Sequence, residues 1–202
     1  MSTARSSAAE SLTDGRLTVN QAARRRRVIE AAAELAGEGG YEAVQMRDVA
    51  ARADVALGTI YRYFESKDQL LAATLVDWAA RLRRRLDAKP PVGATPTERV
   101  VDVVRRASRS IERNQRLSSA LVTAMASHDE GVHTYQAEVS DILVSLLDGA
   151  LDGVDAEHRA GVLRILSQVW FAALIGWVNG WRSVGNVGDE LEFAARFLLA
   201  GP

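Results

Sequence analysis

The segment 156–182 constrains the fold most, because its apolar residues fall on nearly every side of the helix that it is predicted to form. These apolar residues are Val162, Leu163, Ile165, Leu166, Val169, Trp170, Ala173, Leu174, Ile175, Trp177 and Val178. A helix that is apolar on all sides has to be covered on all sides. Arg164, Ser167 and Gln168 interrupt the run, which argues against a membrane span. Either one large domain encloses this helix, or one of its faces packs against a partner.

We expect that partner to be a second copy of the chain. Ala172, Gly176 and Gly180 have small side chains or none, so they would let two helices approach closely. A last helix at 188–200 carries Phe193 and Phe197 and can supply the other half of an isologous four-helix bundle. The alternative is a monomer with a large core that hides both faces.

Helical periodicity continues through the rest of the chain, without strand-like alternation or a repeat of fixed period, so the predicted fold class is all-α. Residues 1–19 are rich in Ser, Ala and Thr and are expected to form a flexible arm. Capping boxes at Ser66–Gln69 and Thr95–Glu98 mark two helix starts. The predicted helices begin at Arg24, Met46, near Leu57 and at Lys67, and then cover about 96–113, 116–126, 134–152, 156–182 and 188–200.

Two short helices joined by a tight turn between residues 46 and 64 form a unit in which the second helix can lie in the major groove of DNA. Ile60 and Phe64 are four residues apart and can bury one face of that second helix. The remaining residues offer hydroxyl, guanidinium or ammonium groups to phosphates and base edges, or a close approach at glycine. These candidate DNA-binding residues are Gly58, Thr59, Tyr61, Arg62, Tyr63 and Lys67.

The alternative for this unit is a three-helix packing module with a polar outer face. Charge favours DNA slightly, because residues 1–89 carry 15 Lys and Arg against 12 Asp and Glu, whereas residues 90–202 carry 10 against 14. The run Arg24–Arg27 leaves two roles open. It can contact phosphates or the minor groove, or it can form a solvated face paired with Glu30 and Glu34.

The stretches Tyr41–Ala50, Ala53–Phe64 and Ser66–Leu71 resemble the DNA-binding signature of the TetR family of bacterial repressors, over about residues 22–75. Within that family, Gly40–Arg47 together with Gly93–Pro96 is similar to the KstR-type repressors of sterol catabolism in actinobacteria.

The resemblance implies an omega-shaped homodimer with nine helices per subunit, bound to a palindromic double-stranded operator. Residues 20–65 would form the helix-turn-helix DNA-binding domain, and residues 66–202 the domain for ligand binding and dimerisation. Arg47 would contact a base or phosphate from the second helix, while Tyr61 and Lys67 would hold the backbone. Thr59, Arg62 and Tyr63 would act from the recognition helix. Gln45 departs from the Ser or Thr of many relatives, so the second helix is expected to fray or shift at its start.

The resemblance also implies an effector cavity between the long helices. Residues that can line it are Trp78, Leu82, Leu121, Val122, Met125, Ile142, Leu146, Trp170, Leu174 and Trp177. The alternative is that this aromatic and Met stripe is simply core. If the closer resemblance holds, the ligand would be a small apolar effector such as the CoA thioester of a sterol fragment. It would bind the state in which the heads are spaced wrongly for DNA.

Several classes of function are not expected. The chain has no cysteine and no signal-peptide pattern, so we expect a cytoplasmic protein without a disulfide framework. His128 and His133 are five residues apart around Gly131, which predicts a solvated turn and not a metal site. No catalytic motif is found, so neither an enzyme nor a cofactor is expected. The remaining rival is a helical small-molecule carrier or scaffold that does not bind DNA.

Overall fold

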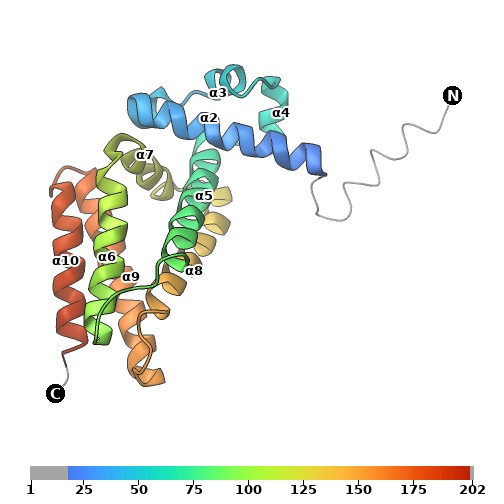
Figure 1. Cartoon of the computed structure of the whole chain (residues 1–202). Helices are drawn as coiled ribbons and strands as arrows, with labels where there is room; N and C mark the ends of the chain where they lie inside the picture. Colours follow the sequence, from blue (N-terminus) through green and yellow to red (C-terminus); the bar gives the residue numbers. More distant parts are fainter. Residues whose placement is uncertain (1–17, 201–202) are drawn as a thin grey trace.

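The computed structural model describes residues 18–200, which form nine α-helices and one short 3-10 turn and contain no strand (Figure 1). The elements are α2 (Val19–Ala43), α3 (Met46–Arg52), α4 (Leu57–Tyr61), α5 (Lys67–Asp87), α6 (Pro96–Glu112), α7 (Gln115–Met125), η1 (Glu130–Val132), α8 (His133–Asp148), α9 (Ala156–Val178) and α10 (Val184–Leu198). The all-α prediction is confirmed. Most of the predicted arm, residues 1–17, lies outside the described residues.

Helices α2, α3 and α4 form the head, which lies across one end of the molecule (Figure 1). Thr18 caps α2 through a capping box with Gln21, five residues before the helix start expected from the sequence. Gly40 has φ 75° and kinks the helix, which then continues to Ala43. The turn between α3 and α4 contains Asp54 at φ 51°, a left-handed conformation that Asp tolerates better than most residues.

The head core contains large side chains that are completely buried, among them Val28, Val49, Ile60 and Phe64. Helices outside the head complete this core. Leu70 and Leu71 of α5 belong to it, and so do Ala120, Leu121 and Ala124 of α7. The head is therefore seated directly on two helices of the remaining part of the chain, which we call the body.

The body consists of α5 to α10, whose long helices extend away from the head (Figure 1). Helix α10 packs against α6 and α9, and α5 packs against α7 and α8. The two predicted capping boxes are present in part or whole: Ser66 caps α5 by accepting from the Gln69 amide, and Thr95 and Glu98 form a reciprocal box at α6. Trp78 packs against both the head core and the body core.

The last two helices have boundaries that the sequence pattern did not predict. Helix α9 ends at Val178 and not at 182, because the Trp181 and Gly180 amides donate to the Gly176 and Trp177 carbonyls, with Gly180 at φ 75°. This is a Schellman motif, which terminates a helix at a left-handed glycine. Helix α10 begins at Val184, four residues earlier than expected, behind a capping box formed by Ser183 and Asn186.

Helix α9 is long and apolar enough to cross a membrane by length and composition, with a mean hydropathy of 1.6 over 18 residues. The body core encloses its buried positions, which include Val162, Leu166 and Trp170 and make up 28% of that window. The core therefore accounts for part of this composition.

Candidate DNA-binding surface and effector cavity

Helix α4 presents a polar surface because two apolar residues fix its orientation. Ile60 and Phe64 are completely buried in the head core. Tyr61 and Arg62 are therefore exposed, while Thr59 and Tyr63 are half-buried at the edge of the same surface. A side chain added at Gly58 would meet no protein atom within 4 Å, so this position is open to an approaching partner.

Helix α3 adds a cation to that surface. The Arg47 side chain is 86% exposed, and its Nε lies 3.6 Å from the Asp48 carboxylate. An ion pair that is this exposed contributes little to stability and leaves the guanidinium accessible. Gln45 occupies the N-cap position of α3 without capping it, and its side-chain amide donates to the Glu42 carbonyl at 3.0 Å. The helix nevertheless starts at Met46, where the sequence places it.

Lys67, at the start of α5, is held by Tyr41 at the end of α2. Its Nζ lies 3.7 Å above the centre of the Tyr41 ring and donates to the Tyr41 carbonyl at 3.4 Å. The Tyr41 hydroxyl donates to Asp68 at 2.6 Å. Burial and this hydrogen bond raise the pKa of Tyr41, so it stays protonated. These contacts with Tyr41 therefore fix the position of the Lys67 side chain relative to the end of α2.

The run Arg24–Arg27 divides between structural and exposed roles. The Arg25 guanidinium lies 5.2 Å from the centre of the Phe64 ring, and Arg27 donates to the Ala53 carbonyl at 3.2 Å. Arg27 therefore braces the turn between α3 and α4, and Arg25 packs on the segment that follows α4. Arg26 is 3.9 Å from Glu30 and largely exposed. Phosphate contacts by the exposed members stay a prediction.

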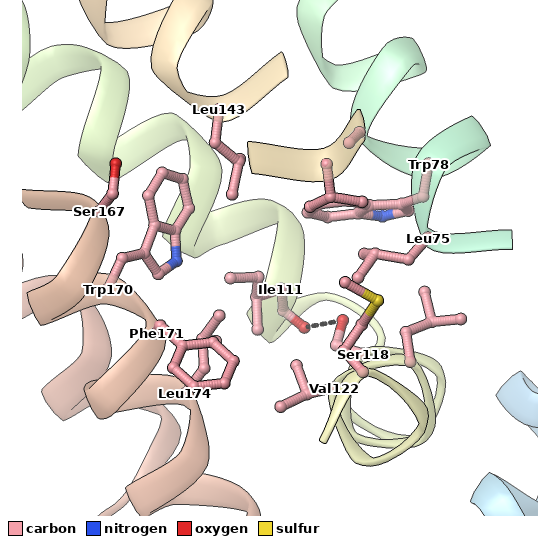
Figure 2. A pocket seen from close by; sticks show the side chains of 14 residues that line it. Leu75, Trp78, Ile111, Ser118, Val122, Leu143, Ser167, Trp170, Phe171 and Leu174 are labelled. Atoms are coloured by element: carbon pink, nitrogen blue, oxygen red, sulfur yellow. Dashed lines mark hydrogen bonds between the residues drawn. The ribbon is translucent and has the colours of Figure 1, made fainter. Parts of the chain in front are cut away.

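The body contains an apolar cavity of about 100 Å³, partly open to solvent, between α5, α6, α7, α8 and α9. Figure 2 shows Leu75 and Trp78 facing Trp170, Phe171 and Leu174 across it. Of the ten candidate ligand residues, six line this cavity: Trp78, Leu121, Val122, Met125, Trp170 and Leu174. The structure places the other four elsewhere, with Leu82 and Leu146 buried in the body core and Ile142 and Trp177 packed against it.

Eight further residues line the cavity that the sequence reasoning missed. They are Leu75, Ala79, Ile111, Ser118, Val139, Leu143, Ser167 and Phe171. Leu75 and Ala79 lie next to Trp78 on one face of α5, so the helical period could have found them. Ser118 and Ser167 gave no such signal. Their hydroxyls donate to the backbone carbonyls of Ile111 at 3.2 Å and Leu163 at 2.8 Å, which makes them compatible with an apolar lining.

A cationic groove of about 440 Å³ lies next to the cavity, between α5 and α6, and it was not predicted. Its basic residues are Arg85, Lys89, Arg106, Arg109 and Arg113. Arg106 is paired with Asp102 at 2.5 Å. Within residues 18–200, the other four have no carboxylate within 4.0 Å. The groove-lining residues Leu82 and Arg85 follow Trp78 on the same stripe of α5, about one and two helical turns later.

Two family models match the chain. The model for the tetR family of bacterial regulatory proteins covers residues 28–74, and the one for the tetracyclin repressor-like C-terminal domain covers residues 93–198. The chain belongs to the TetR family. It is 38% identical over 196 residues to the HTH-type transcriptional repressor KstR of Rhodococcus jostii RHA1, which covers 95% of this chain and 91% of that protein.

Solved structures agree with the family assignment. A TetR transcriptional regulator from Rhodococcus sp. RHA1 superposes with a TM-score of 0.78 at 33% identity, covering 90% of this chain and 98% of that one. The regulator FadR of Bacillus subtilis, solved with stearoyl-CoA, has a TM-score of 0.64 at 20% identity and covers 88% and 98%. The second likeness shows the shared fold alone. The predicted family and fold are confirmed.

In this TetR-family chain, a polar junction joins the start of α5 to the loop after α7. Ser66 donates to the Asp129 carboxylate, Gln69 contacts it at 3.4 Å, and Ser127 donates to Asp68 at 2.6 Å. The Ser66 hydrogen bond lowers the pKa of Asp129. Gly131 leaves room for Gln69, since a side chain there would overlap the Gln69 amide. The loop predicted as a solvated turn is therefore tied down at Asp129.

No group of three potential metal-ligating residues occurs in the described part of the chain. His128 and His133 flank the junction loop and are both exposed.

The candidate dimer face of this TetR-family chain lies on α9 and α10. Phe193 and Phe197 are 70% and 75% exposed, with their rings stacked 6.5 Å apart, and Ala172 is also exposed. Two of the five candidate residues lie in surroundings that the sequence pattern did not indicate. Gly176 is buried against the Arg182 side chain of its own subunit, and Gly180 lies beyond the end of α9 in the terminating turn. The exposed apolar residues missed on this side are Ile165, Phe171 and Trp181.

Proposed function

We propose that this TetR-family transcriptional regulator is a cytoplasmic homodimeric repressor that binds a palindromic operator and is released by a bulky apolar effector. One observation carries the DNA-binding part. The polar residues at α4 and Arg47 of the neighbouring α3 are accessible, and the completely buried Ile60 and Phe64 fix the orientation of α4. Phosphate contacts would position the head, while Arg62 and its neighbours would read base edges.

Dimerisation is supported by the apolar surface that α9 and α10 leave exposed. Phe171, Phe193 and Phe197 are each more than half exposed, which is unusual for large aromatic side chains in a solvated monomer. A second copy packed on this face would cover them and form an isologous bundle. It would also place two heads on one duplex, as a palindromic site with half-sites about 34 Å apart requires.

Effector release follows from the size of the cavity. Its volume of about 100 Å³ is smaller than the roughly 150 Å³ of an apolar cavity that accommodates benzene. A sterol skeleton or a long acyl chain is much larger, so its binding has to displace a wall helix. Helix α7 supplies part of the wall and packs along α2 of the head. The effector would then favour the state with displaced heads and weaken operator binding by its differential affinity.

An acyl-CoA is the effector class that we favour, including the CoA thioester of a sterol fragment. The relative from Rhodococcus jostii is a KstR repressor, and the Bacillus subtilis relative was solved with stearoyl-CoA. The cationic groove supports this class. It starts about 10 Å along α5 from Trp78, at Arg85, so the phosphates of CoA can lie there while the acyl part enters the cavity.

The test is binding of the full-length protein to a palindromic duplex selected from random sequence, measured by fluorescence anisotropy at several salt concentrations. Arg62→Ala and Tyr63→Ala should each weaken binding at least tenfold. Arg83→Ala is the matched control, because Arg83 is an exposed arginine of α5 far from α4, and it should bind as the parent does. Equal affinity in all three variants, or no salt-dependent binding, would favour a helical carrier or scaffold instead.

A further inference from the structure

The cavity contains one buried polar atom without a partner. Trp170 is 3% exposed, and its indole Nε1 has no hydrogen-bond partner among residues 18–200. Figure 2 shows this nitrogen on the side of the ring that faces the cavity. Among the other polar groups of the lining, the Ser118 and Ser167 hydroxyls already donate to backbone carbonyls, and the Trp78 indole nitrogen is not one of the buried unpaired atoms. Buried N–H groups are nearly always paired in folded proteins, so this one calls for an explanation.

A ligand oxygen explains the unpaired indole better than a buried water does. A buried water needs two to four polar partners, and beside the two indole N–H groups this largely apolar lining offers only the acceptor lone pairs of Ser118 and Ser167. An indole N–H only donates, so its missing partner is an acceptor. No residue that lines the cavity is charged. A carboxylate would therefore be desolvated without a counter-charge, which is very costly, whereas a neutral oxygen would not.

We propose that the effector inserts a neutral carbonyl oxygen, from a ketone or a thioester, which accepts a hydrogen bond from Trp170 Nε1. This inference deepens the proposed effector site and rests on the cavity being that site. Trp170 then determines specificity by favouring ligands with a carbonyl over hydrocarbons of the same shape. Trp78 lines the same cavity but would contribute apolar contact only.

The experiment uses the full-length protein and two small probes that differ at one position, cyclohexanone and methylenecyclohexane. Both probes are far smaller than a sterol skeleton or a long acyl chain, so adjustment of side chains around the cavity of about 100 Å³ should admit them without displacement of a helix. Affinities are measured by calorimetry for the parent, Trp170→Phe and the matched control Trp78→Phe. Trp170→Phe should weaken cyclohexanone about tenfold and change methylenecyclohexane less than twofold. Trp78→Phe should change both probes by the same factor.

A spectroscopic measurement on the parent protein keeps the test valid if a variant fails to fold. In ¹⁵N-labelled protein, the indole signal that is absent from Trp170→Phe should shift downfield with cyclohexanone and not with methylenecyclohexane. Binding of cyclohexanone without that shift, or equal losses for both probes in Trp170→Phe, overturns the proposal. Operator binding is measured separately, so its persistence in that case leaves the proposed DNA-binding function standing. No binding of either probe overturns both the inference and the effector cavity.

Discussion

The head and the body differ in how closely their apolar residues pack. The head fills its core completely, with Ile60 and Phe64 fully buried beneath the DNA-binding surface. The body leaves a cavity at its centre, where Trp78, Trp170 and their neighbours face each other without meeting. A surface that reads DNA has to be rigid, and a site that admits a large effector has to yield. The comparison teaches that packing density divides the two tasks within one chain.

The largest expected effect tests the close packing of the head core. Phe64→Ala should lower the free energy of unfolding by about 3–5 kcal/mol, because it leaves a void in the head core and removes the ring beneath Arg25. Urea denaturation followed by circular dichroism measures the change. A loss below about 1 kcal/mol would contradict tight packing in the head.

The next prediction concerns the cationic groove beside the cavity. Arg85→Gln combined with Arg109→Gln should weaken stearoyl-CoA binding about 100-fold, because each guanidinium supplies a charge-assisted contact to phosphate. Isothermal calorimetry measures this, with Arg84→Gln on the neighbouring face of α5 as the control. Stearate carries no phosphate, so its affinity should not change. An equal loss for stearate would show that the double variant disturbs the body generally.

The free space in the body can be tested by filling the cavity. Val122→Phe places extra volume into it and should weaken stearoyl-CoA at least tenfold. Stability should stay level or rise by up to about 1 kcal/mol, because cavity filling commonly stabilises proteins. Thermal denaturation monitors the second quantity. Destabilisation by about 1–3 kcal/mol, which is typical of overpacked cores, would mean that no free space exists there.

A smaller effect is expected at the start of α3. Gln45→Ser would place a hydroxyl where it can accept from the amides of the first turn, which the glutamine does not do. The unfolding free energy should rise by about 1 kcal/mol or less, and Gln45→Ala should not reproduce the gain. If the alanine variant gains as much as the serine variant, capping is not the cause.

The last prediction concerns the polar junction and pH. The folded state lowers the pKa of Asp129 through the Ser66 hydrogen bond, so this carboxylate contributes stability above its unfolded pKa of about 4. That contribution is lost as the pH falls through the lower, folded pKa. Asp129→Asn should therefore be less stable than the parent at pH 7 and converge with it in acid. Urea midpoints from pH 7 to pH 3 test this, and a constant difference would contradict it.

The head was largely readable from the sequence because its determinants are local. The four-residue spacing of Ile60 and Phe64 assigned the inner and outer faces of α4, and Ser66 marked the start of α5. The body was harder. Trp170 and Leu174 were expected at the cavity and line it, yet Leu146 follows the same apolar period and lies in the body core, while Leu82 lies between that core and the cationic groove. Periodicity shows which residues point inward, but a void depends on how closely helices distant in sequence approach one another.

The ends of helices were also difficult to predict from the sequence. Gly180 was assigned to an interface because small residues permit close packing, whereas its left-handed backbone ends α9. Gly40 is also left-handed, but it only kinks α2, which continues to Ala43. In the sequence, nothing separates Gly180 from the apolar run before it. The domain boundary at residues 65 and 66 stays a prediction.

The place of Leu121 in the structure sets a condition for changing which molecules this protein detects. Its side chain is 1% exposed, belongs to the head core and also lines the cavity. Redesign of the cavity at Leu121 would therefore alter the foundation of the head together with ligand preference. Val139 and Leu143 line the cavity without contributing to the head core or to the proposed dimer face. Libraries that alter ligand preference while preserving operator recognition should vary these two positions and keep Leu121 constant.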